Sequence, residues 1–185
     1  MDKRILTEMN EQELNLLHQY LFKAGIEKKY KKGTNIIQEG HVSNRFYLLK
    51  KGLIRGWTSN NGKEITFQFL FENRLFCATE SFFYNTPCSY SMETIENSIL
   101  LSIDSKEMDL LQKDEFFLKL FNKYLISRLA SYQHLLISRI QDKPEIRYKK
   151  LLEENPQLLL RVPQHYIASY LGITAVSLSR IRNRR

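Results

Sequence analysis

Cysteine is scarce in this chain, with only Cys77 and Cys88 among 185 residues. Two thiols can build neither a disulfide framework nor a four-thiolate metal site, so a reducing compartment is expected. No apolar run is long enough to span a bilayer, and charges are scattered through the first residues where a signal peptide would have an apolar core. These absences predict a cytoplasmic protein with no membrane partner.

Acidic residues are also in deficit, with 20 Asp and Glu against 28 Lys and Arg. The imbalance is concentrated near the end of the chain. Residues 139–185 contain ten Lys and Arg against four Asp and Glu, which accounts for six of the eight net positive charges. A basic segment of this kind favours a polyanionic partner, because it can neutralise phosphates.

The basic segment ends in a pattern typical of a helix-turn-helix. Two short apolar faces at helical spacing flank Gly172, which suits the positive φ of a tight corner. Thr174 stands where the N-cap of the second helix belongs, because its hydroxyl can accept a free amide of the next turn. The first face consists of Ile167, Ala168 and Leu171, and the second of Leu178 and Ile181.

In a helix-turn-helix the second helix enters the DNA major groove. Arg180 is the best candidate for a guanine contact, because its guanidinium matches the O6 and N7 acceptors. Ala175 and Val176 suit contact with a thymine methyl, and the other basic side chains would hold phosphates and set the register. Two short helices that merely close a small domain would give a similar pattern, but the coinciding charge favours DNA. The candidate DNA-binding residues are Thr174, Ala175, Val176, Ser177, Ser179, Arg180, Arg182, Arg184, Arg185 and Lys149.

Earlier in the chain the pattern predicts a helix followed by many short strands. An amphipathic helix is expected from Thr7 to Ala24, and from Ile26 onward short apolar runs alternate with glycines. Asn61-Gly62 is a strong hairpin signal. The strands expected after it are residues 65–70, with one face in a core, 89–95 and 99–103. Such strands with glycine turns indicate a sandwich, jelly roll or barrel.

From Ser105 the pattern returns to helix. Asp114 can cap a helix running to about Ile140, and a helix of about 25 residues is about 38 Å long, more than a domain of this size needs. Part of its apolar stripe would then be available to the same helix of a second subunit, with one-sided packing on the barrel as the alternative. Pro144 marks a boundary, followed by a short basic helix to Glu154. The stripe consists of Leu118, Phe121, Leu125, Leu129, Tyr132 and Leu136.

This order of elements, together with the segment KKGTNIIQEGHVSNRFYLLKKGLIRGW, resembles the Crp/Fnr family of bacterial transcription regulators. Gly33, Gly40 and Gly52 stand at the family's roll glycines, and Gly172, Arg180 and Ile181 match its helix-turn-helix. The ending is similar to that of Bacteroidetes-type members. The resemblance implies an α+β chain with three parts: a cyclic-nucleotide-binding-like jelly roll (a double-stranded β-helix) at 1–115, a dimerisation helix at 116–142 and a helix-turn-helix domain at 143–185. Family members continue past the recognition helix into a β-wing, whereas this sequence ends at Arg185, so either the wing is short or absent or the C-terminus is truncated.

The resemblance also implies an effector pocket in the roll, at Glu80, Ser81, Cys88 and Ser89. In members that bind a cyclic nucleotide, a Gly-Glu pair holds the ribose and an Arg-Ser pair holds the phosphate. Here Glu80 stands at the glutamate, but Thr79 replaces the glycine and Pro87-Cys88 stands where Arg-Ser would be. The phosphate would lose its bidentate guanidinium, and proline has no N–H to replace it. The chain is therefore expected not to bind cyclic AMP in the usual way.

Together these observations predict a homodimeric, sequence-specific regulator that binds double-stranded DNA, carries no cofactor or metal and is not an enzyme. The resemblance leaves room for an unknown small-molecule effector in the roll and for RNA polymerase as a further partner. The alternative is a small-molecule-sensing or protein-interaction module whose helical tail binds a protein. A cupin-type enzyme would need a metal-binding H-x-H in the central strands, and the sequence has none.

Overall fold

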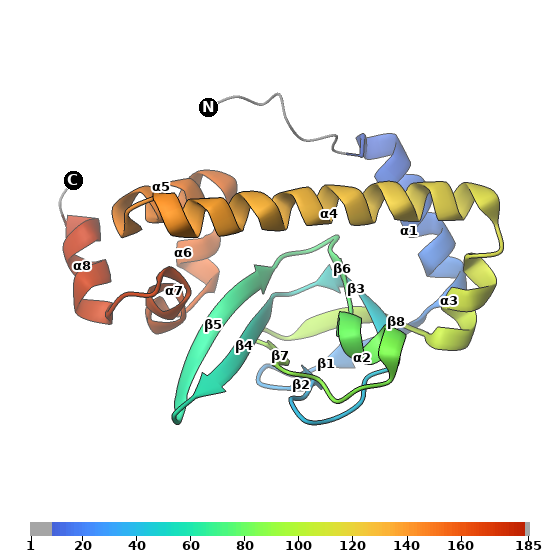
Figure 1. Ribbon diagram of the computed structural model, residues 1–185, viewed down its shortest axis with the longest axis horizontal. Helices are drawn as coiled ribbons and strands as arrows, with labels where there is room; N and C mark the ends of the chain where they lie inside the picture. Colours follow the sequence, from blue (N-terminus) through green and yellow to red (C-terminus); the bar gives the residue numbers. More distant parts are fainter. Residues whose placement is uncertain (1–8, 184–185) are drawn as a thin grey trace.

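The computed structural model describes residues 9–183 and shows a β-roll crossed by one long helix (Figure 1). Both sheets are four-stranded and antiparallel, in the orders β1-β8-β3-β6 and β2-β7-β4-β5. The mixed fold with a roll of short strands and helices at its C-terminal end is therefore confirmed. The strands are β1 (Ile26–Tyr30), β2 (Asn35–Ile37), β3 (Arg45–Lys51), β4 (Ile54–Asn60), β5 (Lys63–Leu70), β6 (Leu75–Phe76), β7 (Ser91–Thr94) and β8 (Ser98–Asp104). The helices are α1 (Glu11–Ala24), α2 (Thr79–Tyr84), α3 (Ser105–Leu111), α4 (Glu115–Gln141), α5 (Pro144–Glu154), α6 (Leu158–Arg161), α7 (Gln164–Leu171) and α8 (Ala175–Asn183).

The first helix begins later than the sequence predicted. Asn10, not Thr7, is the N-cap of α1: its side chain accepts from the amide of Glu13, whose carboxylate accepts from the amide of Asn10. This reciprocal capping box satisfies two amides that the helix itself leaves free, which fixes the start at Glu11. Thr7 lies outside the described residues.

The hairpin between β4 and β5 turns at Asn61-Gly62, as predicted. Both residues have positive φ, 51° and 75°, which is the requirement of a two-residue type I′ turn. The expectation that β5 has one face in a core was incomplete, because the second half of the strand is covered on both faces. Leu70 packs inside the roll, while the ring of Phe69 lies 5.3 Å from that of Tyr170 on α7. Sequence alternation could not reveal a helix that comes from 100 residues further along the chain.

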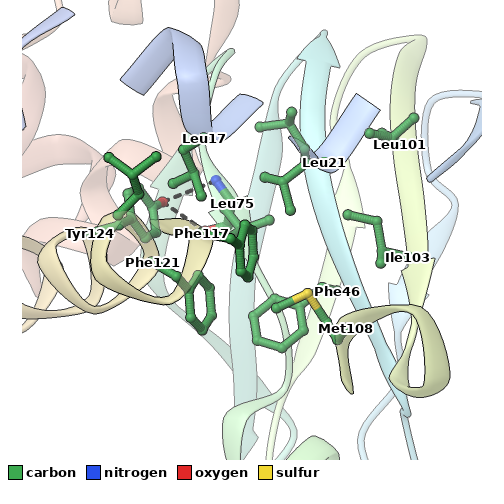
Figure 2. Close-up of a cluster of buried hydrophobic side chains, with 12 residues drawn as sticks. Leu17, Leu21, Phe46, Leu75, Leu101, Ile103, Met108, Phe117, Phe121 and Tyr124 are labelled. Carbon is green, nitrogen blue, oxygen red and sulfur yellow. Dashed lines mark hydrogen bonds between the residues drawn. The ribbon is translucent and has the colours of Figure 1, made fainter. Parts of the chain in front are cut away.

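A core lies on the outer face of the first sheet, under α1, α3 and the beginning of α4 (Figure 2). The one polar side-chain group that Figure 2 shows there, the hydroxyl of Tyr124, is hydrogen-bonded to the backbone of Leu75. The cluster comprises Leu17, Leu21, Phe46, Leu48, Leu75, Leu101, Ile103, Met108, Phe117, Leu120, Phe121 and Tyr124. A second cluster, which includes Tyr47, Leu49 and Leu100, fills the interior of the roll.

The long helix α4 is buried only toward its start. Asp114 caps it as predicted, accepting from the amides of Phe116 and Phe117. Its 27 residues extend about 40 Å, so the helix reaches past the roll (Figure 1). Beyond Tyr124 most of its large apolar side chains are exposed, and Leu129 and Leu136 are each 60% exposed.

The C-terminal helices share a third core with the roll. Leu53 and Ile95 of the roll are buried together with side chains of α5, α6, α7 and α8. α5 begins at Pro144 and ends at Glu154, as predicted, whereas α2 and α6 were not foreseen. Among residues 9–183 no helix is both long enough and apolar enough to cross a lipid bilayer.

Candidate nucleic-acid interface

The turn between α7 and α8 has the geometry that the sequence indicated. Gly172 ends α7 in the left-handed region with φ 68°, and the amide of Ile173 donates to the carbonyl of Ala168 at 3.0 Å. Thr174 caps α8, since its hydroxyl accepts from the amide of Ser177 at 3.1 Å. Leu178 is fully buried, while Val176, two residues earlier, is 62% exposed. The burial fixes which face of α8 packs on α7 and which faces solvent.

The solvent face of α8 presents the predicted contact residues together. Ala175, Val176, Ser179 and Arg180 are exposed, and so is the N-cap Thr174. Ser177 and Arg182 are half-buried. Lys149 is exposed on α5, and Arg184 and Arg185 lie outside the described residues. The structure therefore gathers the α8 residues on one accessible surface, and their role in DNA binding stays a prediction.

Some basic residues of the C-terminal segment are held by a carboxylate and others are not. Lys150 is paired with Asp142, and Arg161 with Glu72 and Glu96. In contrast, Arg180, Arg182 and Lys149 form no ion pair within the part of the chain that the structure describes. A cation without a carboxylate partner can bind a phosphate or a base edge without first breaking an internal contact.

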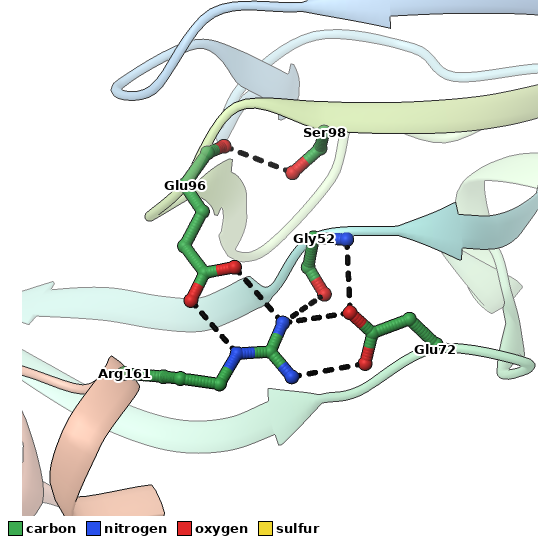
Figure 3. A network of polar contacts seen from close by, with 5 residues as sticks. All are labelled: Gly52, Glu72, Glu96, Ser98 and Arg161. Carbon is green, nitrogen blue, oxygen red and sulfur yellow. Dashed lines mark hydrogen bonds and ion pairs between the residues drawn. The ribbon is translucent and has the colours of Figure 1, made fainter. Parts of the chain in front are cut away.

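Arg161 fastens the C-terminal helices to the roll (Figure 3). Its Nη2 and Nη1 donate to the two carboxylate oxygens of Glu72 at 2.7 and 3.0 Å, and Nε donates to Glu96 at 2.8 Å. Nη2 also donates to Glu96 and to the carbonyl of Gly52, each at 2.9 Å. Hydrogen bonds to Glu96 and Glu72 raise the pKa of Arg161, so the guanidinium keeps its charge at any physiological pH. We call Arg161, Glu72, Glu96 and Gly52 the Arg161 clasp.

A second arginine, Arg55, also connects the roll to α7. Arg55 of β4 is 1% exposed, and its charge is balanced by Glu64 at 2.6 Å and Glu93 at 2.7 Å. Its guanidinium carbon lies 3.8 Å from the ring centre of Tyr166 on α7. Burial of the guanidinium strengthens such a cation–π contact, because the charge is removed from water. Sequence reasoning missed Arg55 and Arg161, because their partners are distant in the chain and follow no local pattern.

A small cavity lies between the roll and α4. Its volume is about 120 Å³, below the roughly 300–1,000 Å³ of ordinary ligand pockets. Arg128 and Tyr132 of α4 border it, and the hydroxyl of Tyr132 accepts from Gln68 at 2.9 Å and from Arg128 at 3.1 Å. The complete lining is Phe46, Gln68, Leu75, Phe76, Cys77, Thr79, Tyr90, Met92, Tyr124, Leu125, Arg128 and Tyr132. Burial raises the pKa of the Cys77 thiol to about 12, so it is not a reactive thiolate at neutral pH.

None of the four predicted effector residues lines this cavity. Glu80 and Ser89 are exposed, and Cys88 packs in the interior core. Ser81 is buried and its hydroxyl accepts from the amide of Ser43 at 2.7 Å. The four side chains are therefore not brought together around one space, and their assignment to an effector site stays a prediction.

Comparisons with known proteins agree with this architecture. Residues 27–115 match the model of the cyclic nucleotide-binding domain. No curated protein matches the chain significantly in sequence. The fold of the whole chain is similar to that of the c-di-GMP-responsive global regulator CLP from Xanthomonas campestris, with a TM-score of 0.70 and 13% identity over 92% of this chain and 90% of that one.

Two further solved structures share the fold over most of both chains. A CooA mutant from Carboxydothermus hydrogenoformans has a TM-score of 0.69 and 21% identity, covering 96% of this chain and 84% of its own. FixK2 from Bradyrhizobium japonicum has a TM-score of 0.68 and 18% identity, covering 86% of this chain and 83% of its own. At these identities the likeness shows a common fold that includes both the roll and the C-terminal helices.

Proposed function

We propose that this protein is a sequence-specific, DNA-binding transcription regulator of the Crp/Fnr type, with an ending like that of Bacteroidetes-type members. Residues 1–115 would form the sensor roll, 116–142 the dimerisation helix and 143–185 the helix-turn-helix domain. The observation that carries the proposal is the solvent face of α8, where Arg180 is exposed together with Ala175, Val176 and Ser179 and forms no ion pair with any residue of 9–183. That face has the shape and charge needed to enter a major groove. The fold shared with the global regulator CLP supports the same conclusion.

The contacts divide into two kinds in this proposal. Arg180 would read a guanine through O6 and N7, and Ala175 and Val176 would meet a thymine methyl. Arg182, Lys149, Arg184 and Arg185 would hold phosphates and set the register of α8 on the duplex.

The exposed half of α4 supports a homodimer. Its exposed apolar residues recur at helical spacing on the side of the helix that the roll does not cover, and burying them against the same helix of a second copy would remove them from water. Such a dimer would present two α8 helices about 34 Å apart to successive major grooves of a pseudo-palindrome.

Cyclic AMP is not the effector in this proposal. The amide of Cys88 is already bonded to the carbonyl of His41 at 2.9 Å, and Pro87 has no amide to offer a phosphate. The cavity beside α4 is also too small for a nucleotide as it stands. The effector in this proposal is an unknown small molecule that enlarges this cavity when it binds. The regulator would act in the cytoplasm, with RNA polymerase as a further partner.

Binding to DNA is tested by measuring the anisotropy of a labelled mixed-sequence duplex at increasing salt. The expected result is a linear fall of log K with log salt, with a slope of about −0.9 for each phosphate contacted. Weak binding that salt does not change would contradict the proposal. That outcome would favour the alternative, a module whose helical tail binds another protein.

A further inference from the structure

We infer that the Arg161 clasp sets the spacing of DNA half-sites, by holding α7 and α8 at a fixed position on the roll. This inference rests on the proposed function. It assigns specificity to residues that do not touch DNA, which makes Arg161 a positioning residue.

The clasp gathers three separate turns of the roll around one guanidinium. Glu72 lies between β5 and β6, Glu96 between β7 and β8, and Gly52 between β3 and β4. Arg161 is the last residue of α6, and α7 begins three residues later, at Gln164. Because a guanidinium is planar and rigid, five hydrogen bonds to three turns fix both its place and its direction.

Two further side chains of α7, those of Tyr166 and Ser169, hold the helix to the roll. The ring of Tyr166 stacks on the buried guanidinium of Arg55. The hydroxyl of Ser169 accepts from the amide of Thr66 at 2.9 Å and donates to the carbonyl of Glu64 at 3.2 Å. α7 is therefore tied to the roll just before its start, near its start and in its last turn.

The position of α8 follows from that of α7. The two helices are joined by a short turn and share the buried side chains of Leu171 and Leu178. The roll in turn is packed on the beginning of α4, which is the proposed dimer helix. In the dimer the distance between the two α8 helices is then set by the roll as well as by the end of α4. Releasing the clasp would remove the contact just before the start of α7 and leave those of Tyr166, Ser169 and the shared core, so the distance between the α8 helices would be held less tightly.

The test uses the site that the wild-type protein selects from a randomised duplex pool. Affinities are measured for that duplex, for duplexes in which the spacer between the two half-sites is one or two base pairs longer or shorter, and for a duplex that contains a single half-site. The proteins are the wild type, Arg161→Gln and the control Arg74→Gln, an exposed arginine in the same turn as Glu72. The wild type and the control should prefer the selected spacer. For Arg161→Gln, the ratio of the affinity for the selected spacing to the affinity for the other spacings should fall about fivefold or more. Its affinity for the single half-site should equal that of the wild type.

An unchanged spacer preference in folded Arg161→Gln would overturn the inference, and so would an equal loss on the half-site and on all spacers. If Arg161→Gln does not fold, Glu72→Gln provides the same comparison, because it removes one charge of the clasp and keeps the side-chain volume. A wild-type protein that selects no site would instead contradict the proposed function, so the two failures are distinguishable.

Discussion

The hydroxyl of Tyr124 forms two hydrogen bonds with the backbone of Leu75: it donates to the carbonyl and accepts from the amide, each at 3.0 Å (Figure 2). Tyr124 lies on α4 and Leu75 on β6, so this pair joins the long helix to the roll. Both partners are buried.

Tyr124→Phe should therefore destabilise the protein more than its small chemical change suggests. It removes one hydroxyl but leaves a buried amide and a buried carbonyl without partners, which costs about 1–3 kcal/mol. Urea denaturation at fixed protein concentration measures the effect. The matched control is Tyr132→Phe, whose hydroxyl also has two partners but is half-exposed, so water can replace it. Equal losses in the two variants would contradict this account of the Tyr124 contact.

The packing of α8 on α7 depends on Leu178. Leu178→Ala removes a completely buried side chain and should cost about 2–5 kcal/mol in the free energy of unfolding. Val176→Ala, on the opposite face, should change it by less than about 0.5 kcal/mol. Thermal denaturation of both variants checks the assignment of faces. A larger loss for Val176→Ala would mean that α8 is turned the other way.

The exposed stripe of α4 predicts the oligomeric state. Leu129→Glu places a charge in the middle of the proposed dimer seam, where burying it without a partner is costly, and should produce monomers. His134→Glu places a carboxylate at an exposed position about 140° around the helix from Leu129 and should leave the dimer intact. Light scattering after size-exclusion chromatography distinguishes the two. A wild-type protein that is monomeric at high concentration would contradict the proposed dimer interface along α4.

Acid should weaken the Arg161 clasp through Glu72. Burial raises the pKa of Glu72, but hydrogen bonds from Arg161 and from the amides of Glu72 and Gly52 outweigh it, so the pKa lies below its usual value. A carboxylate whose pKa is lower in the folded state stabilises the protein fully above the unfolded pKa, about 4.3, and loses this contribution as the pH falls through the folded pKa. The free energy of unfolding of Glu72→Gln should accordingly fall less steeply than that of the wild type below about pH 4.3. Identical slopes for the two proteins would show that protonation of Glu72 does not contribute to the pH dependence of the free energy of unfolding.

Local features of this fold could be predicted from the sequence because their causes are local. Asp114 caps α4, Asn61-Gly62 turns the hairpin and Pro144 begins α5, each through its own backbone preference or side-chain hydrogen bond. The start of α1 was placed wrongly because a second capping signal follows Thr7 in the sequence, and the helix begins after Asn10, which forms a capping box with Glu13.

Long-range features could not be predicted, because no spacing rule encodes them. Nothing in the sequence indicates that Arg161 meets Glu72, which lies 89 residues earlier, or that Tyr166 stacks on Arg55. The same limit applies to the cavity beside α4. Its lining comes from several strands and from α2 and α4, while the residues predicted from family resemblance, such as Glu80 and Ser89, are exposed elsewhere.

The most direct test of the central claim compares Arg180→Ala with the wild type on the selected duplex and on random DNA. Arg74→Ala, an exposed arginine of the roll, serves as the control. A side chain that reads a base contributes about 1–3 kcal/mol to specific binding, equivalent to roughly 5–150-fold in affinity. Arg180→Ala should lose that much on the selected site, with little loss on random DNA and no loss in the control. An equal loss on both duplexes, or none on either, would contradict base readout by α8.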